Sequence, residues 1–287
     1  EAVAAELVEG KATAPGPASA AVMVALEAVM RPKLRDSGSA EMAALRDGLD
    51  GKFVRPGPSG APTRGRLDVL PTGRNFYSVD NRAIPTPTAW ELGQRAAAAL
   101  LQRHFQDQGT HLGRIALSVW GTSCMRTGGD DIAQALALIG AKPTWDPGSL
   151  RLSGYEIVPL PRLGRPRVDV TLKISGLFRD AFPQQIALFD KAMRAVGALD
   201  EPEADNPIAA RMRSDALGMM RDGASAAEAA LKAGHRIFGS KPGAYGAGLQ
   251  ALIDSGNWTE TAQLGEAFLN WGQYAYGAHA AGTAEHG

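Results

Sequence analysis

The chain of 287 residues is 45% hydrophobic and 21% charged, a composition that supports a packed core and excludes an intrinsically disordered segment. Its 30 basic and 30 acidic side chains cancel, so no overall field favours nucleic acid or an anionic membrane surface. Cys124 is the only cysteine, which excludes an internal disulfide and a cysteine-based metal cage. The longest apolar stretch, residues 20–26, is too short to span a bilayer, and we expect a cytoplasmic piece of a longer protein.

Residues 1–65 are predicted to form a helical segment followed by a loop. An alanine-rich helix is expected over residues 20–30 and should stop near Pro32, because proline lacks the N–H group that continues a helix. A second helix is expected to end at Gly51. The prolines and glycines of residues 56–65 exclude regular structure there and indicate either a linker or a cover over a site.

Residues 66–200 are predicted to form an α/β domain built from Rossmann-like strand–turn–helix units. Thr86, followed by proline, is typical of a helix start, and this helix should run to about Phe105. Apolar runs predict strands over residues 115–120 and 168–174. Each strand is followed by a turn and by apolar residues at helical spacing, a succession that favours a parallel sheet.

Residues 201–287 are predicted to be mostly helical, with a glycine-rich loop. Ser225 and Glu228 have the spacing of a capping box, so a helix should begin there. The loop over residues 239–248 lacks the order of a P-loop, and its glycines run in the reverse order of a dinucleotide-binding fingerprint. No strong strand is expected before this loop, and no nucleotide site is expected in the chain.

The segment Met125-Arg-Thr-Gly-Gly-Asp-Asp131 is expected to join a strand to a helix, at the edge of the sheet where ligands bind. A partly desolvated aspartate there could bind a divalent ion or accept a proton. Asp130 and Asp131 also fall in the first turn of the predicted helix, where the helix dipole by itself favours carboxylates. A purely structural role for this pair therefore stays open.

The five histidines never approach metal-ligand spacing with one another. His111, just before the first predicted strand, is the second and less favoured metal candidate after Asp130.

Arginines in turns are candidates for binding ligand carboxylates, because a guanidinium group binds a carboxylate in a bidentate fork. Arg165 and Arg167 directly precede the second predicted strand, at the opposite end of the sheet. We expect these two to form structural ion pairs, with Asp169 as a candidate partner. The arginines predicted to contact a ligand are Arg74, Arg126 and Arg179.

Five motifs carry these residues: Gly73-Arg-Asn-Phe-Tyr-Ser-Val-Asp80, Trp120-Gly-Thr122, Met125-Arg-Thr-Gly-Gly-Asp-Asp131, Gly164-Arg-Pro-Arg-Val-Asp169 and Ser175-Gly-Leu-Phe-Arg-Asp180. Together they resemble the large subunits of the ATP-dependent chelatases that insert a metal ion into a tetrapyrrole. The resemblance covers about residues 49–276. It favours the cobaltochelatase branch (CobN type) over its sister, the magnesium chelatase H subunit. The segments that favour this branch are Thr127-Gly-Gly-Asp-Asp131, residues 239–245 and Tyr274-Ala-Tyr-Gly277.

The resemblance implies an internal segment of a subunit that inserts Co²⁺ into hydrogenobyrinic acid a,c-diamide in aerobic cobalamin (vitamin B12) synthesis. The alternative is a segment that acts with Mg²⁺ on protoporphyrin IX. The implied partners are the tetrapyrrole, the rest of the large subunit and separate AAA+ subunits that hydrolyse ATP. Asp130 and Asp131 become the catalytic candidates, with Asp130 also binding the metal. The implied substrate-binding residues are Arg74, Asn75, Tyr77, Asp80, Arg126, Arg179 and Tyr245.

A non-catalytic role, as a cavity wall or a docking module for the motor subunits, stays open. The family uses a downstream segment rich in Asp, Glu and Asn that lies outside this chain, so the chain alone is predicted to be inactive. A flat macrocycle also needs apolar walls, although ordinary core packing is the alternative for each candidate. The aromatic residues beside the motifs are Phe76, Tyr77, Trp120, Phe178 and Tyr245.

Overall fold

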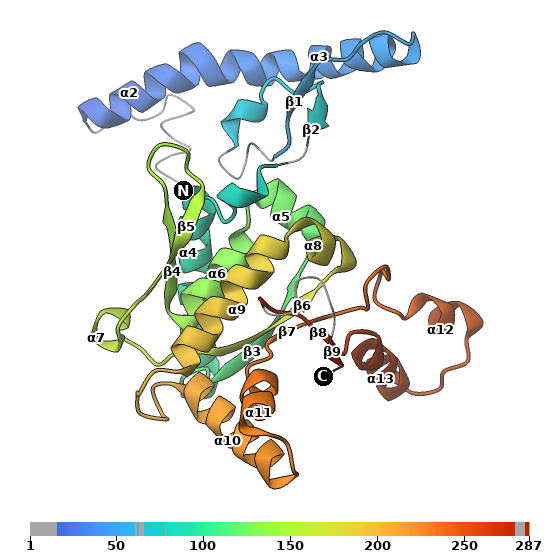
Figure 1. Ribbon diagram of the computed structural model, residues 1–287. Helices are drawn as coiled ribbons and strands as arrows, with labels where there is room; N and C mark the ends of the chain where they lie inside the picture. Colours follow the sequence, from blue (N-terminus) through green and yellow to red (C-terminus); the bar gives the residue numbers. More distant parts are fainter. Residues whose placement is uncertain (1–15, 61, 63–65, 78, 279–284, 287) are drawn as a thin grey trace. The chain divides into compact units, whose positions relative to one another are not determined.

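The computed structural model describes residues 16–60, 62, 66–77, 79–278 and 285–286, and the chain divides into two compact units, residues 1–79 and 80–287 (Figure 1). The sequence patterns had placed boundaries at residues 65 and 200. The first unit extends beyond residue 65 because β1 (Pro56–Pro58) pairs in parallel with β2 (Asn75–Tyr77). The last third of the chain belongs to the second unit because it adds strands to the main sheet.

In the first unit, a helical run passes through Pro32, so the predicted stop there is wrong. The run consists of α2 (Pro17–Ala25), a π-helical turn η1 (Leu26–Met30) and α3 (Arg31–Leu49), and η3 (Leu67–Val69) follows β1. A proline ring normally clashes with the carbonyl four residues earlier. In the π-helical turn η1 each backbone N–H bonds to the carbonyl five residues earlier, instead of four. Pro32 follows this turn and lies in the first turn of α3, where a proline is tolerated.

The second unit is built around a mixed sheet with the strand order β3-β6-β7-β8-β9. The first three strands are parallel, and β3 is in register with β6 from the pair Arg114–Asp169 to the pair Val119–Ile174. The prediction of an α/β fold with Rossmann-like units is confirmed. The strands are β3 (Arg114–Val119), β6 (Asp169–Ile174), β7 (Ile237–Gly239), β8 (Tyr274–Ala275) and β9 (Glu285–His286).

The sequence shows no strong strand before the glycine-rich loop, and in the structure the short strand β7 lies directly before it and extends the parallel sheet. This strand has three residues, too few to show an alternating pattern.

Three long helices pack together over the sheet (Figure 1). They are α4 (Pro87–Gln108), α6 (Asp130–Ile139) and α9 (Pro183–Gly197). Helix α6 contacts β3, β6, α4 and α9, and its Ile132, Leu136 and Ile139 are fully buried. The predicted start of α4 is confirmed, since the Thr86 hydroxyl accepts a hydrogen bond from the backbone N–H of Ala89.

Residues 121–127 form a helix, whereas the sequence predicted that the glycine-rich motif leads directly from a strand to a helix. Asp130 therefore begins the second of two consecutive helices, and the seven-residue helix before it is too short to show a hydrophobic period. The remaining elements are η4 (Asn81–Ala83), α5 (Gly121–Thr127), β4 (Ala141–Trp145), β5 (Leu152–Ile157), α7 (Leu160–Leu163), α8 (Gly176–Ala181), α10 (Pro207–Arg221), α11 (Ala226–Ala233), α12 (Gln250–Ser255) and α13 (Thr261–Trp271). None of the described helices is long and apolar enough to span a membrane.

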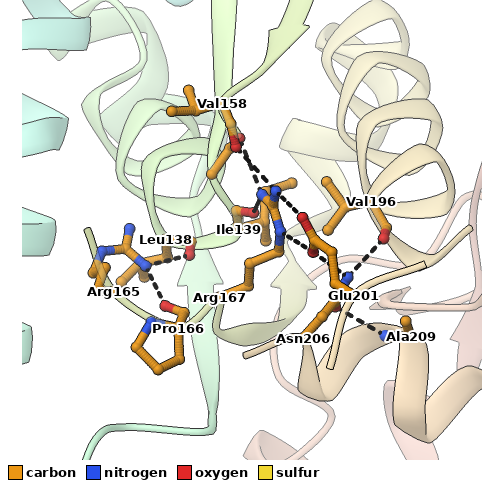
Figure 2. Close-up of polar contacts among 11 residues, drawn as sticks. Leu138, Ile139, Val158, Arg165, Pro166, Arg167, Val196, Glu201, Asn206 and Ala209 are labelled. Atoms are coloured by element: carbon orange, nitrogen blue, oxygen red, sulfur yellow. Dashed lines mark hydrogen bonds and ion pairs between the residues drawn. The ribbon is translucent and has the colours of Figure 1, made fainter. Parts of the chain in front are cut away.

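A buried charge network lies beside the amino-terminal end of β6 (Figure 2). Arg167 has no exposed surface and donates to both carboxylate oxygens of Glu201 at 2.7 and 2.8 Å. Its other bonds go to the carbonyls of Ile139 at 3.0 Å and Val158 at 2.9 Å. The amide of Asn206 donates to Glu201 at 2.8 Å, so one guanidinium group connects the end of α6, the end of β5 and the segment between α9 and α10.

Arg167 forms a structural ion pair, as expected, whereas Arg165 bonds to main-chain carbonyls, and the suggested partner Asp169 is wrong for both. Arg165 donates to the carbonyls of Ala137 at 2.6 Å and Leu138 at 3.1 Å. Asp169 instead pairs with Arg236, at 2.7 Å and 3.2 Å. The reason is strand β7, which pairs with β6. Arg236 directly precedes β7 and therefore lies beside Asp169, the first residue of β6.

We predict that Arg167→Ala lowers the free energy of unfolding by about 3–5 kcal/mol, because it removes the fully buried member of the ion pair and leaves Glu201, whose side chain is 14% exposed, without its counter-charge. Urea denaturation of the chain measures this loss. Arg211→Ala is the control, since Arg211 forms an exposed ion pair with Asp215 and its removal should cost about 1 kcal/mol or less. Equal losses in the two variants would contradict the prediction.

The same substitution should change the response to acid. The hydrogen bond from Arg167 lowers the pKa of Glu201, so its contribution to stability is present above the ordinary carboxyl pKa of 4.5. That contribution is lost as the pH falls through the lowered pKa. We therefore expect the stability of the Arg167→Ala variant to fall less between pH 5 and the acid limit than that of the wild-type chain.

Candidate functional site

Hydrogen bonds join the turns that follow β3 and β6 at the carboxyl edge of the sheet. Ser175, directly after β6, accepts hydrogen bonds on its hydroxyl from the backbone N–H groups of Gly121 and Phe178, both at 3.1 Å. Its own N–H donates to the carbonyl of Val119 at 3.0 Å. The hydroxyl therefore caps α8 and anchors the start of α5, which places both helices at the edge where parallel strands bind ligands.

Arg179 anchors the glycine-rich loop that follows β7. The residue is 6% exposed, and its Nη1 donates to the carbonyls of Ser240 at 3.1 Å, Lys241 at 2.7 Å and Ala244 at 3.1 Å. These bonds satisfy three backbone acceptors with one planar group. They support a role for Arg179 as a loop anchor, while its predicted contact with a ligand carboxylate stays a prediction.

The remaining donors of Arg179 bind its neighbour Asp180, which in turn holds Tyr245. Nε and Nη2 of Arg179 reach the Asp180 carboxylate at 2.6 and 2.9 Å, and this bonding lowers the pKa of Asp180. The Tyr245 hydroxyl donates to the same carboxylate at 2.6 Å, which raises the pKa of the tyrosine. The guanidinium carbon lies 5.5 Å from the centre of the Tyr245 ring, so the ring is positioned by both neighbours.

The turn before Asp130 packs against residues 84–86. Gly128 and Gly129 both have left-handed backbones, and a Cβ atom on Gly129 would lie 2.5 Å from Cγ2 of Ile84. The N–H of Thr86 donates to the carbonyl of Gly128 at 3.0 Å. Only glycine fits this contact, so the motif brings the start of α6 against the segment that follows Asp80.

The carboxylates of Asp130 and Asp131 are half-buried in the first turn of α6, close to the buried thiol of Cys124. Burial raises the pKa of Cys124, and the negative charges of Asp131 and Asp130 raise it further. The thiol therefore stays protonated and is not a metal ligand in this state. Among the described residues, no group of three or more His, Cys, Asp or Glu side chains is gathered to hold a metal ion.

The structure does not bring His111 to Asp130. His111 is exposed and lines a hollow of about 360 Å³ together with Arg165, which bonds to the last turn of α6. Asp130 is the first residue of the same helix. The ten residues of α6 separate the two by about 15 Å, so one ion cannot bind both.

Asp80 forms ion pairs with two arginines. Its carboxylate accepts from Nε of Arg82 at 3.0 Å and from Nε of Arg151 at 2.9 Å. The hydrogen bond from Arg82, assisted by Arg151, lowers the pKa of Asp80 from 3.8 to about 2. Nearby, the buried amide of Gln185 donates to the carbonyl of Ile84 at 2.8 Å, which holds this segment on α9.

The other predicted contacts have different settings. Arg126 is exposed in the last turn of α5, in the second unit. Arg74 and Asn75 belong to the first unit, where they are exposed and line a hollow of about 620 Å³. Tyr77 ends β2 of the first unit, and its side chain lies outside the described residues. The substrate-binding roles of these residues remain predictions.

Sequence reasoning overlooked two residues that shape this edge. Ser175 begins the motif Ser175-Gly-Leu-Phe-Arg-Asp180. A serine three residues before the N–H group that it caps, here that of Phe178, is a signal for a helix start. Gln185 gave no signal, because its two acceptors, the carbonyls of Asn81 and Ile84, lie about a hundred residues earlier in the chain.

A parallel sheet with anchored turns and charged side chains at its carboxyl edge is a ligand-binding α/β architecture. The family model described as CobN/Magnesium Chelatase matches residues 2–287. The chain therefore belongs to the CobN/magnesium chelatase family of metal chelatases.

The relatives agree with this assignment. The chain is 61% identical to the aerobic cobaltochelatase subunit CobN of Sinorhizobium, over 99% of the chain and 22% of the relative. It is 38% identical to the H subunit of the magnesium chelatase of Rhodobacter capsulatus, over 83% of the chain and 19% of the relative. A solved structure, the catalytic subunit of cobaltochelatase from Mycobacterium tuberculosis, matches with a TM-score of 0.79 at 45% identity, over 93% of the chain and 22% of that structure. The chain thus spans about a fifth of the length of these relatives.

We predict that Arg82→Gln raises the pKa of Asp80 toward its usual value of 3.8, because the carboxylate loses its main charged donor. Arg151→Gln should raise it by less. A pH titration of the Asp80 carboxyl carbon by NMR measures both shifts. Arg103→Gln, which removes the exposed partner of Asp107, is the control and should leave the Asp80 titration in place. An unchanged Asp80 titration in Arg82→Gln would count against the ion pair.

Proposed function

We propose that the chain is an internal segment of the large, substrate-binding subunit of an ATP-dependent cobaltochelatase. That subunit would insert Co²⁺ into hydrogenobyrinic acid a,c-diamide in aerobic cobalamin biosynthesis. The observation that carries the proposal is the higher identity to the cobaltochelatase subunit than to the magnesium-chelatase subunit, over nearly the whole chain. Action with Mg²⁺ on protoporphyrin IX is the alternative within the family.

Asp130 is the proposed catalytic carboxylate, with Asp131 as its neighbour. Metal insertion needs a group that replaces water on the arriving ion and a base for the departing pyrrole protons. A half-buried carboxylate at a helix start suits the first task, because divalent ions accept carboxylate oxygens as ligands. The metal ion is a substrate here, so the lack of a cluster of ligands around Asp130 among the described residues is compatible with brief contact.

The proposed substrate contacts remain those expected from the motifs. Arg126 is the arginine best placed to meet a carboxylate at the rim of the macrocycle, because it is exposed beside the turn after β3. Tyr245, on the loop after β7, and Asp80, which pairs with Arg82 and Arg151, are the other proposed contacts of the second unit. Arg74, Asn75 and Tyr77, in the first unit, stay proposed substrate contacts by their motif, and Arg179 is a proposed contact through the loop that it anchors.

The proposed partners are the rest of the large subunit and AAA+ subunits that hydrolyse ATP, in a cytoplasmic complex. The chain lacks a P-loop sequence, which supports a separate site for ATP. A non-catalytic wall or docking module is the second candidate function. It is favoured by the absence, among the residues described, of three gathered metal ligands.

We predict that Asp130→Asn in the full-length subunit lowers the rate of cobalt insertion at least about tenfold, equal to ~1.4 kcal/mol of barrier, because an amide neither binds the ion as well nor accepts the proton. Macrocycle binding and folding should stay nearly unchanged. The matched control is Asp131→Asn, which should have the smaller effect. Wild-type turnover of Asp130→Asn in the reconstituted complex would place the active site elsewhere.

A further expected outcome concerns the isolated chain. It should insert no cobalt without other subunits, since it spans about a fifth of its relatives and has no nucleotide motif. Absorbance spectra of the macrocycle, recorded with Co²⁺ and ATP, measure insertion. The reconstituted complex serves as the positive control, and insertion by the chain alone would refute the expectation.

A further inference from the structure

Three large apolar side chains are exposed at the carboxyl edge of the sheet, one after each parallel strand. Trp120 follows β3 and is 55% exposed, Leu177 follows β6 and is 37% exposed, and Tyr245 follows β7 and is 60% exposed. Single exposed apolar residues need no explanation, but a contiguous group marks a binding surface.

The three turns are in direct contact through two glycines. A Cβ atom on Gly121, next to Trp120, would lie 2.7 Å from Cγ of Leu177. One on Gly176, next to Leu177, would lie 2.7 Å from Cδ1 of Tyr245. The absence of side chains at these two positions lets the turns close into one row. Neighbouring strands are about 4.8 Å apart, so the row from β3 to β7 is about 10 Å wide.

Tyr245 is held in place although it is exposed. Its hydroxyl donates to Asp180 at 2.6 Å, and the Arg179 guanidinium lies 5.5 Å from the ring centre. One contact fixes the edge of the ring and the other lies against its face, so the exposed surface is presented in a fixed orientation. A positioned ring loses little conformational freedom when it stacks on a ligand.

Two exposed cationic side chains are carried by the elements that carry this row. Asp180 is already paired with Arg179. Arg126, on α5 after Trp120, and Lys241, on the loop after β7, are both exposed. Exposed cations on the helix after Trp120 and on the loop that carries Tyr245 suit a ligand that is apolar on its face and anionic at its rim.

We propose that Trp120, Leu177 and Tyr245 form a platform that binds one face of a near-planar tetrapyrrole, with Arg126 and Lys241 meeting the carboxylates at its rim. The inference rests on the proposed function and specifies where this unit contacts the substrate. A macrocycle matches the row because its flat apolar face suits exposed rings and its anionic rim suits the two cationic side chains.

The test uses the full-length subunit and hydrogenobyrinic acid a,c-diamide, with binding followed by the absorbance of the macrocycle. Trp120→Ala and Tyr245→Ala should each raise Kd about tenfold, the size of a lost aromatic stacking contact. Trp120→Phe and Tyr245→Phe keep a ring and should stay within about threefold of the wild-type subunit. Trp258→Ala is the matched control, since Trp258 is 37% exposed on the loop before α13 and its loss should leave Kd unchanged.

Each outcome bears on a different claim. Wild-type binding by both alanine variants would overturn the platform and leave the proposed function intact. Failure of the wild-type subunit to bind the macrocycle would remove the proposed function and the platform with it. Acrylamide quenching of tryptophan fluorescence tests whether another part of the subunit covers the row. If Trp120→Phe removes no quenchable emission from the ligand-free subunit, the row is an internal contact and the platform is overturned.

Discussion

The buried guanidinium of Arg167 is the interaction on which the arrangement of the second unit depends. A charge without exposed surface must meet acceptors on all sides, because an uncompensated buried charge costs several kcal/mol. Its acceptors are Glu201 and the carbonyls that end α6 and β5, three segments that are distant in sequence (Figure 2). Asn206 joins Glu201 to the first turn of α10. The opposite, carboxyl edge of the sheet carries the turns after β3 and β6, which Ser175 joins.

The long periodic elements of the second unit could be predicted because each has a buried face: α6 packs on β3 and β6, and α4 and α9 pack on α6. Helices α4, α6 and α9 and strands β3 and β6 all show the spacing that burial imposes. The hairpin of β4 and β5 was not visible, since Pro143 and Gly154 interrupt its pattern. Strand β7 was not predicted for a different reason, because its three residues are too few to show an alternating pattern. In both cases the segment forms a strand because of its hydrogen bonds to a partner strand, and its own sequence does not show the pattern.

The candidate site was located by its turns, and the roles of its arginines could not be assigned from sequence. Arg126 and Arg179 both follow strands in glycine-containing motifs, yet the first is exposed and the second is 6% exposed. The difference comes from the loop after β7, whose carbonyls lie more than 60 residues downstream of Arg179. Local patterns cannot show such acceptors. The same limitation applies to Asp169, whose partner Arg236 lies 67 residues away.

The acceptors that Arg179 binds on the glycine-rich loop are mostly main-chain carbonyls, and this has a consequence for how the loop can change in evolution. A carbonyl is present whatever the residue, so positions 241 and 244 can exchange their side chains without losing the anchor. Position 179 has no such freedom, because a lysine carries its donors on one atom and cannot span both a carboxylate and a loop. Variation should therefore accumulate in the loop around an invariant arginine. The edge of the sheet could then acquire new ligand preferences while its backbone keeps one shape.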